Sequence, residues 1–175
     1  MLYPDCWKVK NMIDTVKSLV LATAQVLKQN HLTLVTAESC TGGGLSYWLT
    51  SMPGSSDWFE RGFVTYSNAA KVEMLGVNPK TIEEFGAVSA QTVREMAEGA
   101  LHHSHADISI AITGVAGPAG GSPEKPVGTV WIAWAKKSTA TQELVQLFPG
   151  DRQTIRLHAI AKALEKLLEI VSNSR

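Results

Sequence analysis

Apolar residues recur along the chain with two different periods, and the changes of period divide it into predicted helices and strands. Residues 12–29 carry apolar side chains every three or four positions, which is the spacing of an amphipathic helix. The apolar, β-branched run at residues 32–37 predicts a buried first strand, and the amphipathic run at residues 45–52 predicts a second helix. The chain is therefore expected to begin with a helix, a strand, a tight turn and another helix.

The same criteria predict the remaining elements. Further strands are expected at residues 58–66, 107–112, 127–135 and 142–148, and further helices at residues 69–75, 81–85, 89–101 and from Asp151 onward. The connection between the last two strands is short, which favours an antiparallel pair. Helices alternate with strands early in the chain and strands cluster late. This order predicts an α/β fold, namely a three-layer α/β/α sandwich with a mixed, mainly parallel sheet.

The length of 175 residues suffices for one full hydrophobic core, so a single domain is expected. Residues 1–11 are expected to form a loose N-terminal tail, because terminal segments are commonly disordered, and residues 12–175 to form the domain.

The composition excludes several classes of function. The formal net charge is zero, so no basic face is expected that would bind nucleic acid or a membrane surface. Cys6 and Cys40 make no disulfide framework and the first ten residues form no signal peptide, which predicts a cytoplasmic protein. No apolar stretch approaches the about 20 residues of a membrane span. No spacing of His, Cys, Asp and Glu suggests a metal site, and no cofactor is expected.

The turn between the first strand and the second helix, residues 36–44, carries the strongest candidate chemistry. Ser39, Cys40 and Thr41 fall where the helix should expose unpaired backbone N–H groups and the positive end of its dipole, which suits an anion or a nucleophile. Ser39 and Cys40 are competing nucleophiles that position alone does not separate. The structural alternatives are a helix-capping role for Ser39 or Thr41 and a packing role for Cys40, and we favour packing for Cys40.

A distant segment supplies a candidate base. Lys71 has small and apolar neighbours in the predicted helix at residues 69–75, which permits burial. Burial would lower the pKa of Lys71, so that its neutral amine could take the serine proton. Tyr66, at the end of the second predicted strand, could donate or relay a proton at the same site. The alternatives are a solvated surface lysine and a core tyrosine with a hydrated hydroxyl group.

Other residues could hold a substrate. The glycine-rich loop at residues 113–121 follows the third strand, and parallel strands would bring it to the same sheet edge as the Ser39 turn. It matches neither a Walker A motif nor a dinucleotide fingerprint, which disfavours an NTPase. Arg152 could contact an anion, with a surface salt bridge as the alternative. The expected substrate-binding residues are Thr41, Gly42, Gly43, Asn68, Thr113, Gly114, Gly117 and Arg152.

These motifs together resemble the C-terminal domain family of the competence-damage-inducible protein CinA, and in particular its stand-alone amidase members. The similar segments are residues 36–43, 58–71, 86–89, 113–118, 124–130 and 150–152. They extend from the first predicted helix to the last, and their combination is highly specific although no single segment is.

The resemblance implies an amidohydrolase that converts nicotinamide mononucleotide and water to nicotinate mononucleotide and ammonia in pyridine nucleotide salvage. It implies that Ser39 is the nucleophile, that Lys71 and Tyr66 are its partners, and that no metal takes part. A small-molecule nucleotide substrate and a homo-oligomer, a dimer or larger, are expected. The alternative is a non-catalytic module that uses the same loops to bind a nucleotide or a partner protein, which the residues alone do not exclude.

Overall fold

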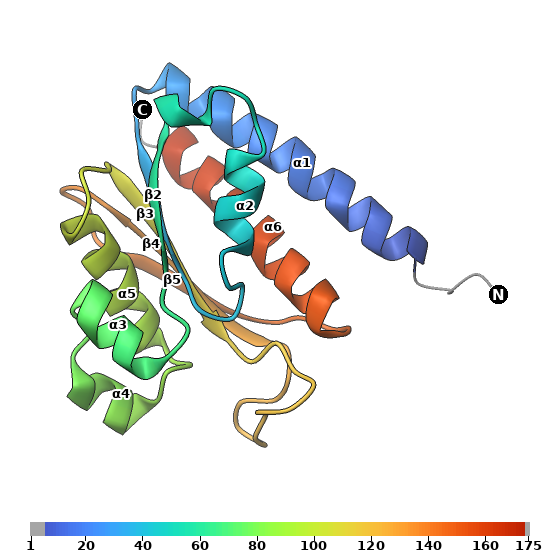
Figure 1. The fold of residues 1–175 in the computed structure, drawn as a ribbon, viewed down its shortest axis with the longest axis vertical. Coiled ribbons are helices and arrows are strands. Elements are labelled where there is room, and N and C mark those ends of the chain that lie inside the picture. The colour runs from blue at the N-terminus through green and yellow to red at the C-terminus, as the bar shows by residue number, and fades with distance from the viewer. Residues whose placement is uncertain (1–5, 174–175) are drawn as a thin grey trace.

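A five-stranded mixed sheet lies at the centre of the computed structural model, which describes residues 6–173 (Figure 1). The strand order is β2-β1-β3-β4-β5. The strands are β1 (Leu34–Glu38), β2 (Phe59–Val64), β3 (Ile108–Gly114), β4 (Thr129–Lys136) and β5 (Gln142–Leu147). The central strand β1 pairs in parallel with β2 and β3, whereas β4 is antiparallel to both of its neighbours. Only β4 therefore runs against the other four strands, which confirms the mixed α/β sheet.

Helices cover both faces of this sheet. The helices are α1 (Cys6–Gln29), α2 (Gly44–Thr50), α3 (Asn68–Leu75), α4 (Pro79–Phe85), α5 (Ala90–His102) and α6 (Arg152–Ser172), with a short 3-10 helix at Ser55–Asp57. Figure 1 shows α1, α2 and α6 on one face, and α3, α4 and α5 on the other. No helix among residues 6–173 has the combined length and apolar character that crossing a membrane requires.

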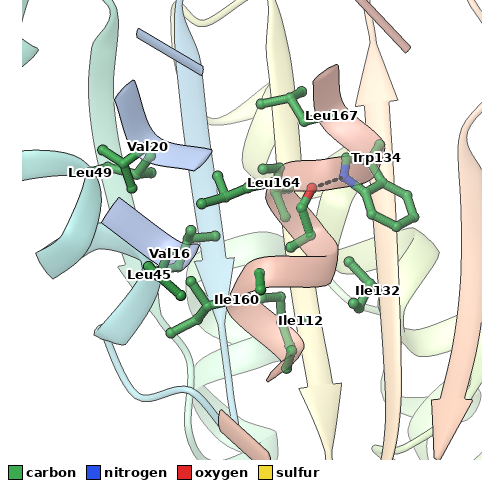
Figure 2. Packing of buried hydrophobic residues seen from close by; sticks show 14 of the residues in the cluster. Val16, Val20, Leu45, Leu49, Ile112, Ile132, Trp134, Ile160, Leu164 and Leu167 are labelled. Atoms are coloured by element: carbon green, nitrogen blue, oxygen red, sulfur yellow. Dashed lines mark hydrogen bonds between the residues drawn. The ribbon is translucent and has the colours of Figure 1, made fainter. Parts of the chain in front are cut away.

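Two hydrophobic cores follow from the alternation of side chains along the strands. On the face of α1, α2 and α6, large aliphatic side chains such as Ile112, Ile132 and Leu164 belong to one buried cluster, and the Trp134 Nε1 group donates to the carbonyl oxygen of Ala163 at 3.0 Å (Figure 2). On the face of α5, the strands present smaller residues, including Ala111 and Ala133. The small side chains leave room for the α5 backbone to lie close to the sheet.

The first helix begins earlier than the spacing predicted. It starts at Cys6, so residues 6–11, expected as part of a tail, are helical, and residues 1–5 lie outside the described residues. The physical reason is that Val9 packs against the same core as Met12 and Ile13, which extends the apolar stripe of the helix by one turn. The apolar residue four positions before Ile13 was the signal for this extension.

Gly99 allows helix α3, which carries Lys71, to lie against α5. A Cβ atom at Gly99 would lie 2.0 Å from the carbonyl oxygen of Leu75, the last residue of α3. That backbone oxygen cannot move without displacing the helix.

We expect Gly99→Ala to lower the free energy of unfolding by about 1–3 kcal/mol, although alanine is the better helix former, because the methyl group overpacks the contact with α3. Urea unfolding measures this change, with Gln91→Ala, an exposed position in the same helix, as the control. A Gly99→Ala protein as stable as the wild type would show that the two helices do not require this close approach.

Candidate active site

The carboxyl ends of three neighbouring parallel strands build one pocket. Ser39 follows β1, Tyr66 and Asn68 follow β2, and the glycine-rich loop follows β3, so the parallel pairing brings all three segments to the same sheet edge. The pocket has a volume of about 300 Å³. Its lining residues are Ser39, Cys40, Tyr66, Asn68, Lys71, Ala87, Val88, Thr113, Gly114, Val115, Ala116, Gly117, Ala119, Gly120 and Arg152.

Ser39 and Lys71 meet inside this pocket. The Lys71 Nζ atom lies 3.0 Å from Ser39 Oγ, and it donates to the carbonyl oxygens of Thr65 at 2.9 Å and Tyr66 at 3.3 Å. Both side chains are buried, with exposed fractions of 8% for Ser39 and 1% for Lys71. Helix α3 begins a few residues after the end of β2, with Ser67 as its N-cap. This short connection places Lys71 over the end of the sheet.

The surroundings of Lys71 favour an uncharged amine. Burial lowers the pKa of Lys71 from its ordinary value of 10.5, and no carboxylate of residues 6–173 forms an ion pair with it. A neutral amine has two N–H donors and one lone pair. The carbonyl oxygens of Thr65 and Tyr66 can accept the two donors, which leaves the lone pair for the hydroxyl group of Ser39. The arrangement can therefore deprotonate the serine.

Cys40 has the opposite character. Its side chain is buried, and burial raises the pKa of the Cys40 thiol to about 12, so the thiolate is scarce at neutral pH. The side chain packs in the core beneath α1, α2 and α6, as a packing residue would. Its backbone N–H group, one residue after Ser39, donates to no backbone carbonyl of the described residues.

Glu38 fills the place that the sequence assigned to a bound anion. Its buried carboxylate accepts from the backbone N–H groups of Leu45 at 2.9 Å and Ser46 at 2.8 Å, and from the Ser46 hydroxyl group at 2.7 Å. The start of α2 is thus satisfied by the protein's own carboxylate. Sequence reasoning missed this role, although a carboxylate just before a helix start was a signal for it.

The predicted substrate-binding residues separate into two groups as a result. Asn68, Thr113, Gly114, Gly117 and Arg152 line the pocket of Ser39. Thr41, Gly42 and Gly43 do not line it: Thr41 is buried, and the two glycines line another cavity. Ala87 and Val88 also line the pocket, but they were not among the predicted site residues. The only sequence signal for them was that residues 86–89 belong to a segment resembling the family.

Tyr66 and Arg152 form a pair in the wall of the pocket. The Tyr66 side chain is 60% exposed, and its hydroxyl oxygen accepts from Arg152 Nη2 at 3.0 Å. Arg152 Nη1 donates to the carbonyl oxygen of Gly117 at 2.9 Å. Tyr66 therefore contacts Lys71 through its backbone carbonyl, while its hydroxyl group lies at the guanidinium. Both partners of Arg152 are neutral, so its charge is available to an anion.

Comparisons with known proteins agree with this architecture. The model of the CinA C-terminal domain family matches residues 16–171. The nicotinamide-nucleotide amidohydrolase PncC of Enterobacter agglomerans is 51% identical over 148 residues, which cover 84% of this chain and 90% of the relative. The protein of the same name from Escherichia coli K12 is 52% identical over 143 residues, which cover 82% and 87%. These relatives confirm the expectation of a hydrolase.

A solved structure confirms the fold expectation. The competence damage-inducible protein A of Klebsiella pneumoniae superimposes with a TM-score of 0.88 at 37% sequence identity, and the match covers 91% of this chain and 99% of that one.

The lowered pKa of Lys71 predicts a pH-dependent stability. Between the lowered pKa and 10.5 the unfolded chain binds a proton that the folded chain does not, so the free energy of unfolding must rise with pH in this interval. In Lys71→Met this contribution is absent. We expect the stability of the wild type, relative to Lys71→Met, to increase as the pH rises toward 10.5 in urea unfolding at a series of pH values. A difference that stays constant would mean that Lys71 is not desolvated.

The contacts of Glu38 predict a second stability effect. In Glu38→Gln an amide NH₂ group faces a backbone or hydroxyl donor, so at least one charge-assisted hydrogen bond is lost, at a cost of about 1.5–3 kcal/mol. Urea unfolding of Glu38→Gln measures this loss, and Glu84→Gln, at an exposed position of α4, is the matched control. Equal stability of the two variants would contradict the assigned role of Glu38.

Proposed function

The chain belongs to the CinA C-terminal domain family, and we propose that it hydrolyses the carboxamide of nicotinamide mononucleotide to nicotinate mononucleotide and ammonia, in pyridine nucleotide salvage. The observation that carries the proposal is the buried amine of Lys71 at 3.0 Å from the hydroxyl oxygen of Ser39. The relatives named nicotinamide-nucleotide amidohydrolases support the choice of substrate.

The reaction is an acyl transfer through a serine ester. Neutral Lys71 takes the proton of Ser39 as Ser39 Oγ attacks the amide carbon. The π electron pair of the carbonyl group moves onto its oxygen, which becomes the oxyanion of a tetrahedral intermediate. The backbone N–H group of Cys40 is the candidate oxyanion donor, a contact of a kind that contributes about 10²–10³ in rate. The Lys71 ammonium group then protonates the departing nitrogen, which leaves as ammonia. Water, deprotonated by Lys71, attacks the ester carbon and releases the carboxylic acid and Ser39.

We assign both proton transfers to Lys71, because the hydroxyl group of Tyr66 is hydrogen-bonded to Arg152. This gives Tyr66 and Arg152 a binding role. The exposed Tyr66 ring can contact the flat face of the pyridine, and the Arg152 guanidinium, which has only neutral partners, can take the substrate phosphate. The loop at residues 114–120 forms the remaining wall of the pocket.

Release of ammonia from nicotinamide mononucleotide tests the proposal. We expect turnover by the wild type and a loss of about 10²–10⁴-fold or more in kcat for Ser39→Ala and Lys71→Met, because each removes one member of the reacting pair. Cys40→Ala should retain most of the activity, since its buried thiol takes no part.

An active Ser39→Ala protein beside an inactive Cys40→Ala protein would show that the nucleophile is the cysteine. Binding of the nucleotide without turnover by the wild type would favour the non-catalytic module instead.

A further inference from the structure

A second cavity lies beside the later residues of the same glycine-rich turn, and we propose that it binds a small ligand with a planar ring and a carboxylate or phosphate group. The cavity has a volume of about 360 Å³ and shares no lining residue with the pocket of Ser39. Residues 42–44 meet Tyr47 and Trp48 of α2 and Arg156 of α6 there. The proposal does not depend on the reaction assigned to Ser39.

Arg156 brings a positive charge that the described part of the chain does not neutralise. Its Nη2 group donates to the carbonyl oxygen of Thr41 at 2.5 Å, and its buried Nε group has no hydrogen-bond partner. No carboxylate of residues 6–173 forms an ion pair with it. A guanidinium group stays charged at every relevant pH and matches the geometry of carboxylate and phosphate oxygens. A half-buried arginine with neutral partners therefore favours an anion in the cavity.

The backbone conformation of the turn explains why Gly42 and Gly43 are glycines, but it does not explain Gly44. Gly42 and Gly43 have positive φ angles of 57° and 86°, which other residues rarely adopt. Gly44 has no such angle, yet a Cβ atom there would lie 3.2 Å from Ile160 Cδ1 and 3.5 Å from Arg156 Nη2. Glycine at position 44 thus keeps the space beside the guanidinium group open, which a bound oxyanion would require.

The aromatic wall indicates the rest of the ligand. Tyr47 is 66% exposed although it lies against the cavity, and its ring meets that of Trp48 edge to face at 5.5 Å between centroids. Aromatic surfaces beside a cation suit a flat ring that carries an acidic group. The guanidinium group of Arg156 would then bind both the ligand and the carbonyl oxygen of Thr41, a residue that lies two positions after Ser39.

Isothermal titration calorimetry on the full chain tests the site with three probes: phenyl phosphate, benzoate and inorganic phosphate. We expect phenyl phosphate or benzoate to bind, and the preferred probe shows whether phosphate or carboxylate is the better head group. Inorganic phosphate should bind more weakly because it lacks the ring. Arg156→Met should weaken the binding at least about tenfold, the loss expected for one charge-assisted contact.

Arg152→Met, which removes an arginine one turn earlier in the same helix from the pocket of Ser39, shows whether a probe binds in that pocket instead. The matched control is Arg94→Met, which removes an exposed arginine of α5 that lines neither cavity. It should leave the affinity unchanged. Gly44→Ala keeps Arg156 and fills the space beside it, so it should also weaken binding, and thermal unfolding verifies that each variant is folded. The proposal is overturned if no probe binds the wild type, if Arg152→Met abolishes binding while Arg156→Met does not, or if neither Arg156→Met nor Gly44→Ala changes the affinity.

Discussion

A lysine amine buried against a serine hydroxyl group is the contact on which the site depends. Burial of a charged amine without a carboxylate partner is very unfavourable, so the fold retains Lys71 in this position with a lowered pKa. The contact requires β1 and β2 to end where α3 begins. Ser39 follows β1, the carbonyl oxygens of Thr65 and Tyr66 follow β2, and Lys71 lies in α3. Parallel pairing of β1 and β2 provides that convergence.

The turn after β1 is held by charged groups of the protein itself. Glu38 satisfies the first N–H groups of α2, and Arg156 donates to the carbonyl oxygen of Thr41. These contacts hold Ser39 on a connection fixed at both ends, so its approach to Lys71 does not rely on a mobile loop. They also separate the turn into a part that lines the pocket of Ser39 and a glycine part that lines the cavity of Arg156.

The layers and most elements could be predicted because each depends on a local pattern. Alternation along β3 and helical spacing along α6 were visible in a few consecutive residues, and the cores confirm both. The start of α1 was predicted too late, since only packing in the folded protein gives Val9 a reason to continue the helix. Thr41, Gly42 and Gly43, expected among the substrate-binding residues, do not line the pocket of Ser39. Which residues of the turn face that pocket depends on how the turn folds back in three dimensions, which a local pattern does not contain.

By itself the sequence determined the spacing of apolar residues in each segment and the position of the glycine turn after a buried strand. It also carried a set of motifs specific enough to indicate the family. The tertiary structure alone decided which distant residues meet. Ser39 and Lys71 are 32 positions apart, and Arg156 and Thr41 are 115 apart. Such contacts depend on strand order and on where each helix ends over the sheet. Those features result from the packing of the whole chain, which no local pattern contains.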